Sequence, residues 1–194
     1  AIATHADCRV WRTRVGSPYV ISGMADAAGA GAARIIGFEA NGGVLTGSDF
    51  RVGEAFLTAL PTRDCALPIL AVLAAARQAG KSLSALIAGL ALPVAASGRI
   101  ENFPTVASRR LVASLATGIA DREAFFAPFG GVRAMDLTDG LRVTLPGGAI
   151  VHLRPSGNAP EMRCYTEAET AEEAEALALA CMARVRDHAK PDDA

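Results

Sequence analysis

The sequence has no excess of charge of either sign. Nineteen Lys and Arg residues stand against 20 Asp and Glu residues in a chain of 194, so the formal net charge is -1. Nucleic acids and anionic membrane surfaces are attracted by proteins with a strongly positive field, and this composition does not supply one. We therefore expect neither nucleic acid nor a membrane among the partners.

Long apolar runs are also absent. The longest stretch of low charge covers residues 82–97 and is interrupted by Gly89 and Pro93. A helix that crosses a bilayer needs about 20 consecutive apolar residues. The sequence therefore predicts a soluble protein.

Cysteine is sparse and unpatterned, with no Cys-x-x-Cys pair and no His at zinc-site spacing. The four cysteines are Cys8, Cys65, Cys164 and Cys181. We interpret them as reduced, mostly buried thiols and expect a cytoplasmic location. The chain begins at Ala1 with no basic or apolar leader, and a strand-like run follows within a dozen residues. This start predicts that the residues come from the middle of a longer polypeptide.

The first half of the chain alternates between strand and helix patterns. A strand is predicted at 8–13, and Ser17 with Pro18 is typical of a helix N-cap followed by proline at the first position. That helix is expected to end near Ala28, and the apolar run at 34–38 predicts a strand buried on both faces. The alternation indicates a three-layer α/β/α domain.

Two further helices are predicted before residue 98. Thr62 or Asp64 can cap the first, which should stop at Gly80, and Pro68 should lie in its first turn or kink it. Ser82 can cap the second. Periodicity then fades over residues 92–105, where Pro, Ser and Gly accumulate, so we expect a linker there and place the domains at 1–97 and 98–194.

The second domain has a different pattern. Helices are predicted at 105–117 and near 121–127, and a last helix should begin at Thr170 with a capping box to Glu173. The four strand-length runs are 132–137, 141–145, 149–154 and 161–168. Short hairpin turns such as 138–140 (Thr-Asp-Gly) join them. We therefore expect an α+β domain with a four-stranded antiparallel sheet and helices on one face.

The most informative segment is 154–160, Arg-Pro-Ser-Gly-Asn-Ala-Pro, between the last two predicted strands. Strand alternation places His152 and Arg154 on the same face, at the point where the loop begins. A guanidinium, a hydroxyl, a flexible glycine and an amide side chain within five residues can bind a tetrahedral oxyanion. An ordinary hairpin loop with a surface arginine has the same composition, so residues alone leave both readings open.

This segment resembles the phosphate-binding loop of the α-D-phosphohexomutases, whose usual form is Arg-Pro-Ser-Gly-Thr-Glu-Pro. Two other segments match the family in the right order. Residues 12–21 are similar to the strand-to-helix turn of its third domain, and residues 37–43, Gly-Phe-Glu-Ala-Asn-Gly-Gly, to its sugar-recognition loop. The chain is identified as the third and fourth domains of a phosphomannomutase or phosphoglucomutase.

The resemblance implies interconversion of hexose 6-phosphate and hexose 1-phosphate by the intact enzyme. It implies that Glu39 and Asn41 bind sugar hydroxyls, as suits a carboxylate and an amide. The phosphate would be bound by Arg154, Ser156, Gly157 and Asn158. Further candidates are Arg12, Arg14, Ser17 and His152, with Ser17 standing where the family often has His. Asn158 and Ala159 replace the family's Thr and Glu.

Two family motifs are missing from these 194 residues. The sequence contains neither the nucleophile loop Thr-Ala-Ser-His-Asn-Pro nor the metal loop Asp-Gly-Asp-Gly-Asp. The resemblance implies Mg²⁺ and a hexose 1,6-bisphosphate activator for the intact enzyme, and we expect this chain to bind no metal and to hold no catalytic residue. The expected partners are a phosphosugar and the N-terminal domains of the same polypeptide, without which this chain should be inactive.

Two other functions remain open at this point. The chain could be a non-catalytic phosphosugar-binding module, because it has a candidate binding loop and no nucleophile. It could also belong to a phosphoglucosamine mutase, because nothing in the sugar loop at 37–43 distinguishes mannose, glucose and glucosamine.

Overall fold

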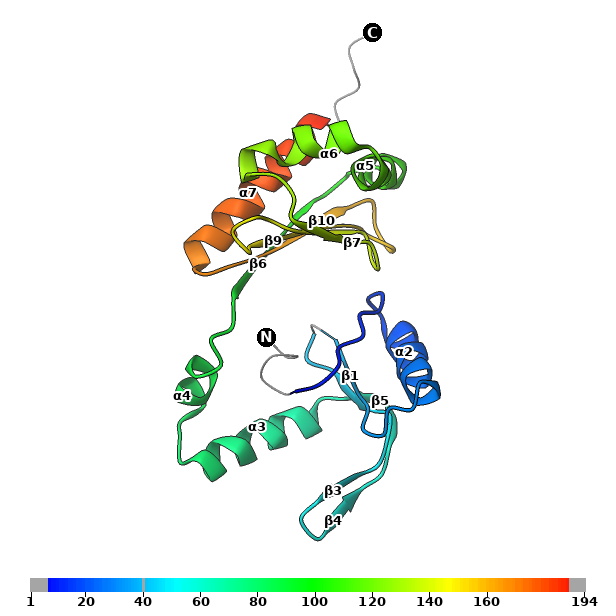
Figure 1. Cartoon of the computed structure of the whole chain (residues 1–194), viewed down its shortest axis with the longest axis vertical. Coiled ribbons are helices and arrows are strands. Elements are labelled where there is room, and N and C mark those ends of the chain that lie inside the picture. Colours follow the sequence, from blue (N-terminus) through cyan, green and yellow to red (C-terminus); the bar gives the residue numbers. More distant parts are fainter. Residues whose placement is uncertain (1–6, 40, 189–194) are drawn as a thin grey trace. The chain divides into compact units, whose positions relative to one another are not determined.

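The computed structural model describes residues 7–39 and 41–188 (Figure 1). The chain divides into two compact units, residues 1–92 and residues 93–194. None of the described helices is both long and apolar enough to cross a membrane.

Unit 1 contains a three-stranded antiparallel sheet of order β1-β2-β5. Its strands are β1 (Ile36–Phe38), β2 (Val44–Thr46) and β5 (Leu60–Asp64), and the separate hairpin is β3 (Phe50–Val52) with β4 (Ala55–Leu57). Helix α2 (Ser17–Gly29) packs against β1 and β5. The small core between helix and sheet is Val20, Met24, Ala27, Ile35 and Leu45.

Helix α4 (Leu83–Ala88) has the predicted cap, Ser82, whereas the N-cap of α3 (Ala66–Ala79) is Cys65, one residue after Asp64, whose side chain still bonds the first turn. The Asp64 Oδ1 atom accepts a hydrogen bond of 2.7 Å from the Ala66 amide, and Ser82 Oγ accepts one of 3.3 Å from Ala85. Gly80 ends α3 in the left-handed conformation. Pro68 lies in the first turn of α3, where its missing N–H is not needed.

Three local predictions for unit 1 are wrong. Residues 8–14 form no regular secondary structure, and Trp11 is 39% exposed there, because no neighbouring strand pairs with this segment in the described structure. The N-cap of α2 is Gly16, and Ser17 is the first helical residue. Strand β1 is buried on one side only: Gly37 is buried, whereas Ile36 and Phe38 are exposed.

Unit 2 contains an antiparallel sheet of five strands, one more than expected. The strands are β6 (Val94–Ile100), β7 (Ala134–Asp136), β8 (Leu141–Thr144), β9 (Ile150–Pro155) and β10 (Met162–Ala168). Their order is β6-β10-β9-β8-β7. The four predicted strands are confirmed, and the additional one, β6, lies within the stretch that we expected to be a linker.

Helix packing explains why β6 carries a glycine that suggested a linker. A Cβ atom at Gly98 would lie 2.4 Å from Met182 Cε, so in the observed packing of α7 (Ala171–His188) on β6 a larger residue would force the Met182 side chain to move. The Gly98 position therefore reflects close packing of a helix on a strand, which sequence composition does not distinguish from chain flexibility.

The other helices of unit 2 are α5 (Thr105–Thr117), α6 (Ile119–Phe126) and the short η1 (Ala127–Phe129). Helices α5 and α7 pack against one face of the sheet (Figure 1). The capping box is confirmed, because Thr170 Oγ1 accepts from the Glu173 amide at 3.1 Å and Glu173 Oε2 accepts from the Thr170 amide at 3.3 Å.

The core of unit 2 is larger than that of unit 1 and lies between these helices and the sheet. Its fully buried side chains include Leu115, Phe125, Phe126, Leu141, Val143, Val151, Leu153, Cys164, Cys181 and Val185. Val151 and Leu153 face this core, so the predicted alternation along β9 is confirmed, with His152 and Arg154 on the other, open face.

The four cysteines are free thiols. Cys164 and Cys181 are buried, as predicted, whereas Cys8 and Cys65 are exposed. The hydrogen bond with Cys164, together with burial, raises the pKa of the Cys181 thiol far above its usual value.

Candidate functional site

The loop between β1 and β2 holds the predicted sugar-binding residues. Its backbone is closed by two hydrogen bonds: the Glu39 amide donates to the Gly43 carbonyl at 2.9 Å, and the Gly42 amide donates to the Glu39 carbonyl at 3.0 Å. Asn41 Oδ1 accepts from the Gly43 amide at 3.0 Å. Asn41 thus uses its carbonyl oxygen to hold the turn, while its side chain stays exposed at the surface.

Ser17 contacts this loop directly. Its Oγ donates a hydrogen bond of 2.6 Å to Glu39 Oε1, across 22 residues of sequence. The other carboxylate oxygen of Glu39 accepts no hydrogen bond from the described residues and can accept one from a ligand hydroxyl. The structure therefore brings together two residues that the sequence analysis had selected for different segments.

Arg12 and Arg14 lie in the segment 8–14, which forms no strand, so the strand predicted at 8–13 does not position either guanidinium. Both are exposed in the segment before α2, and the Arg14 guanidinium lies 5.7 Å from the centre of the Tyr19 ring. No sequence motif points to Arg63 on β5, whose Cδ would lie 2.8 Å from a Cβ atom at Gly43. Only the pairing of β2 with β5 brings this cation to the loop.

In unit 2, the candidate phosphate-binding residues lie at the end of β9. Arg154 Nε donates to Asp139 Oδ2 at 2.6 Å, and the two side chains are only 15% and 20% exposed. The Asp139 carbonyl oxygen lies 2.6 Å from His152 Nε2. The His152 ring is 5.8 Å from the ring of Tyr165 on the adjacent strand. Asp139 therefore joins Arg154 and His152 on the open face of the sheet.

The loop that follows β9 is tied down at its base and exposed at its tip. Ser156 is 3% exposed, and its amide donates to the Glu161 carbonyl at 2.9 Å. Its Oγ accepts from the Asn158 amide at 3.4 Å. Gly157 and Asn158 are exposed. The loop thus presents Gly157 and Asn158 to solvent just after Arg154, while the Ser156 hydroxyl points into the turn.

Further arginines lie on the same open face. Arg163 on β10 is directly opposite Arg154 on β9 and Arg99 on β6. Like charges in opposed positions repel, and the repulsion is reduced here by carboxylates: Glu101 lies 2.7 Å from Arg99, and Glu161 lies 3.5 Å from Arg163.

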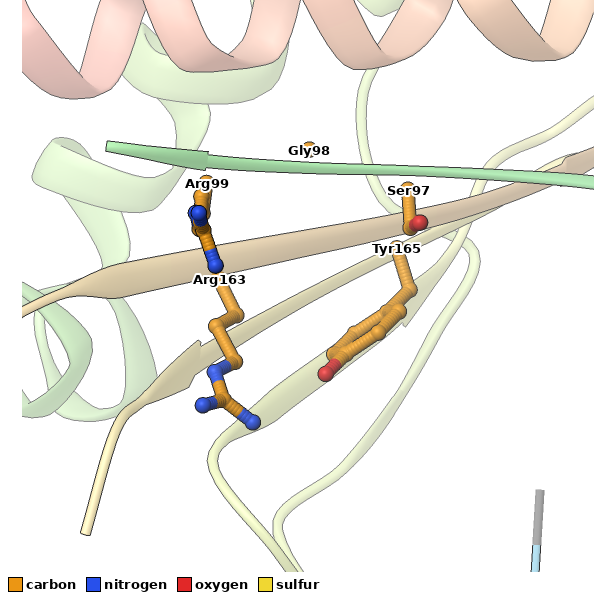
Figure 2. Close-up of a pocket in the computed structure, with 5 residues that line it drawn as sticks. All are labelled: Ser97, Gly98, Arg99, Arg163 and Tyr165. Carbon is orange, nitrogen blue, oxygen red and sulfur yellow. The ribbon is translucent and has the colours of Figure 1, made fainter. Parts of the chain in front are cut away.

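A pocket of about 440 Å³ lies along this face. Figure 2 shows the side chains of Arg163 and Tyr165 on the same side of the sheet. Its lining residues are Ser97, Gly98, Arg99, Arg163 and Tyr165. The open face is thus rich in cationic groups that are each partly balanced by an acidic neighbour.

Asp139 belongs to this site although no sequence motif points to it. It was interpreted only as part of a hairpin turn, because Asp-Gly is typical of turns. The signal that could have found it is the pairing of three consecutive strands, which places the β7–β8 turn beside the end of β9.

No three His, Cys, Asp or Glu side chains gather closely enough to hold a metal ion in the part of the chain that the structure describes. The residues present here do not fit the Mg²⁺ that the resemblance implies for the intact enzyme. We therefore assign none of them a metal-binding role.

Comparison with known proteins agrees with this architecture. Residues 1–92 match the family model "Phosphoglucomutase/phosphomannomutase, alpha/beta/alpha domain III", and residues 106–184 match "Phosphoglucomutase/phosphomannomutase, C-terminal domain". The crystal structure of a phosphoglucomutase/phosphomannomutase family protein from Burkholderia thailandensis has a similar fold, with a TM-score of 0.60 and 20% identity. The match covers 93% of this chain and 32% of that one.

Two proteins named phosphomannomutase are similar in sequence. The one from Sinorhizobium fredii is 55% identical over 87% of this chain and 35% of its own length. The one from Salmonella muenchen is 42% identical over 85% of this chain and 34% of its own length. The chain thus spans about a third of the length of these relatives. On the two domain matches, it belongs to the phosphoglucomutase/phosphomannomutase family and corresponds to its domain III and its C-terminal domain.

Proposed function

We propose that this chain forms the substrate-holding part of a phosphohexomutase that interconverts hexose 6-phosphate and hexose 1-phosphate. The relatives named phosphomannomutase support this activity for the whole protein. The chain's own part in it is binding: Glu39 and Asn41 hold sugar hydroxyls, and Arg154 with the residues after it holds the phosphate that does not react.

The observation that carries the proposal is the anchoring of Arg154 at the entrance to an exposed loop. Its guanidinium is held through Nε by Asp139, and its two terminal nitrogens donate no hydrogen bond to the described residues. Two parallel N–H groups match two oxygens of a phosphate, and charge-assisted hydrogen bonds of this kind are about twice as strong as neutral ones. After Pro155, residues 156–158 complete the proposed phosphate site: Gly157 and Asn158 are exposed, and the buried Ser156 hydroxyl accepts from the Asn158 amide and so shapes the loop.

The sugar site rests on the contact between Ser17 and Glu39. A carboxylate with one oxygen fixed by a hydroxyl presents the other in a defined direction, which suits recognition of a particular sugar hydroxyl. Other candidate side chains lie nearby in each unit. Asn41 belongs to the loop after β1, and Arg63 lies on β5 beside it. The exposed Arg12 and Arg14 precede α2, and His152 lies next to Arg154 in unit 2. We include these residues as secondary contacts.

In this proposal the chemical step belongs to residues outside the 194. A phosphoserine gives its phosphoryl group to the free hydroxyl of the hexose monophosphate, and the resulting bisphosphate returns its other phosphoryl group to the serine. The sequence given contains no Thr-Ala-Ser-His-Asn-Pro loop that could supply this serine. Binding energy from the distant phosphate and hydroxyls can then orient the reacting end of the sugar.

Isothermal titration calorimetry with mannose 1-phosphate tests the proposal. Arg154→Ala should weaken binding by about 10- to 100-fold, at roughly 1.4 kcal/mol per tenfold change. Arg110→Ala is the matched control, since Arg110 is exposed on α5 and should leave the affinity unchanged. Equal affinity of the Arg154→Ala variant and the unaltered chain would overturn the assignment of the phosphate site.

Turnover assays distinguish the alternatives. A full-length protein that converts mannose 1-phosphate or glucose 1-phosphate supports the mutase proposal, whereas preference for glucosamine 1-phosphate favours a phosphoglucosamine mutase. Binding of all three with no turnover by any longer form of the polypeptide would favour a non-catalytic phosphosugar-binding module.

A further inference from the structure

The turn between β7 and β8 lies directly against the end of β9. Gly140 in this turn has φ +82°, and a Cβ atom there would lie 2.4 Å from the Leu153 carbonyl oxygen and 3.1 Å from Arg154 Cα. Neither the left-handed conformation nor the available space suits another residue. Glycine at this position therefore fixes how closely the turn approaches the strand that carries Arg154.

This close approach delivers Asp139 to two side chains at once. Its carboxylate accepts from Arg154 Nε at 2.6 Å, and its backbone carbonyl lies 2.6 Å from His152 Nε2. Because a carbonyl oxygen can only accept, His152 Nε2 must carry a hydrogen in this contact. One turn residue thus fixes the guanidinium by its side chain and the imidazole by its backbone.

The way in which Arg154 is held bears on what it can bind. Asp139 contacts the guanidinium at Nε, and the two terminal nitrogens donate no hydrogen bond to the described residues, so both can donate to an anion. A long side chain that is already ordered loses less freedom when a ligand binds. The opposing effect is charge: the Asp139 carboxylate repels a phosphate and neutralises part of the arginine's attraction for it.

We propose that Asp139 is a positioning residue, which orients the Arg154 guanidinium for anion binding, and that Gly140 makes this possible. This inference rests on the proposed function, because it requires Arg154 to bind the phosphate. It adds a residue of the β7–β8 turn, outside the 154–160 loop, to the determinants of phosphate affinity.

The two effects of Asp139 are separated by two substitutions. Asp139→Asn keeps an oxygen that accepts from Arg154 Nε and removes the negative charge, so affinity for mannose 1-phosphate and for inorganic phosphate should be kept or increased. Asp139→Ala removes the acceptor, and the affinity should fall by about tenfold because the guanidinium must be ordered on binding. Circular dichroism and thermal unfolding show whether each variant is folded.

A double-variant comparison connects the two residues. If Asp139 acts through Arg154, Asp139→Ala should cause little further loss in a chain that already carries Arg154→Ala. The Arg154 Nε–H signal in ¹⁵N–¹H spectra should shift and exchange faster with water in Asp139→Ala and should stay close to its original position in Asp139→Asn. A role in folding alone would not produce this difference between the alanine and asparagine variants.

The outcomes separate this inference from the proposal on which it rests. If Arg154→Ala binds phosphate normally, the proposed phosphate site fails, and this inference with it. If Arg154→Ala weakens binding but folded Asp139→Ala binds normally, or if the two losses simply add, only the role of Asp139 is overturned. Loss of affinity in Asp139→Ala with retention in Asp139→Asn supports the inference.

Discussion

The Ser17 hydroxyl donates a hydrogen bond of 2.6 Å to Glu39 Oε1 and thereby links the first turn of α2 to the loop after β1. The contact also places a carboxylate at a helix N-terminus, where the partial positive charge of the helix dipole favours it. Serine therefore orients the proposed sugar-binding carboxylate, at a position where family members often have histidine.

Removing this hydroxyl tests its role. Ser17→Ala should lower the free energy of unfolding of the chain by about 1 kcal/mol, since a hydrogen bond to a charged, half-buried group is lost. It should also weaken mannose 1-phosphate binding in calorimetry, because the carboxylate is no longer held. Ser17→Thr retains the hydroxyl and should restore both. An alanine variant that matches the threonine variant in both measurements would contradict the assigned contact.

The β7–β8 turn should not tolerate a side chain at its glycine. Gly140→Ala combines a left-handed backbone with a Cβ contact of 2.4 Å to a carbonyl oxygen, and we expect a loss of about 2–4 kcal/mol in urea unfolding. Gly147→Ala is the control, because a Cβ atom there meets nothing within 4 Å, and its change should stay within about 0.5 kcal/mol. Similar stability of the two variants would show that the turn can move away from β9.

Substitutions on the buried face of the sheet in unit 2 should lower stability more than substitutions on the exposed surface of its helices. Leu153 is fully buried under the helices, so Leu153→Ala should cost about 2–5 kcal/mol in the free energy of unfolding. Leu179 on α7 is 67% exposed, and Leu179→Ala should cost less than about 0.5 kcal/mol. Equal losses, measured by denaturant unfolding, would contradict the placement of the core.

The buried thiol pair predicts a fall in stability at high pH. The hydrogen bond with Cys164 and burial raise the pKa of Cys181, so the folded chain keeps this proton when the unfolded chain loses it. Above the usual thiol pKa of 9.0 the unfolded state binds fewer protons than the folded state, and the free energy of unfolding must decrease as pH rises. Urea midpoints measured from about pH 8 upward should show this decrease, as ionisation of the unfolded thiol requires.

Cys181→Ala provides the comparison for that series. It lowers stability at every pH by creating a cavity, but it removes the titrating group, so its midpoint should change less with pH in the same range. A parallel pH dependence in both chains would assign the effect to other groups.

The sequence was most informative where local signals and tertiary packing agree. In unit 2, alternation along residues 150–155, the Asp-Gly turn and the capping box at Thr170 each predicted the observed structure. It was least informative where the local structure depends on a segment that is distant in sequence. The apolar run at 8–13 has strand composition but no partner strand, and Gly98 suggested a flexible linker although it accommodates Met182.

The sequence likewise revealed only those site residues that local motifs or strand alternation mark. Motif resemblance selected the 154–160 loop and Glu39, and strand alternation placed His152 with Arg154. Neither signal revealed Asp139 or Arg63, since each reaches its site only through strand pairing with a segment distant in sequence. The contact between Ser17 and Glu39 likewise depends on how α2 packs beside β1.

The pairing of β6 with β10 determines where a stable C-terminal fragment of this protein can begin. Because β6 is paired with β10 along its whole length, a shortened chain that starts at residue 98 would leave the backbone N–H and C=O groups of residues 165–168 without their partner. Such an uncovered strand recruits strands from other molecules. A C-terminal piece begun at residue 98 should therefore form aggregates or exchanged dimers, whereas one begun at residue 93 should stay monomeric in size-exclusion chromatography.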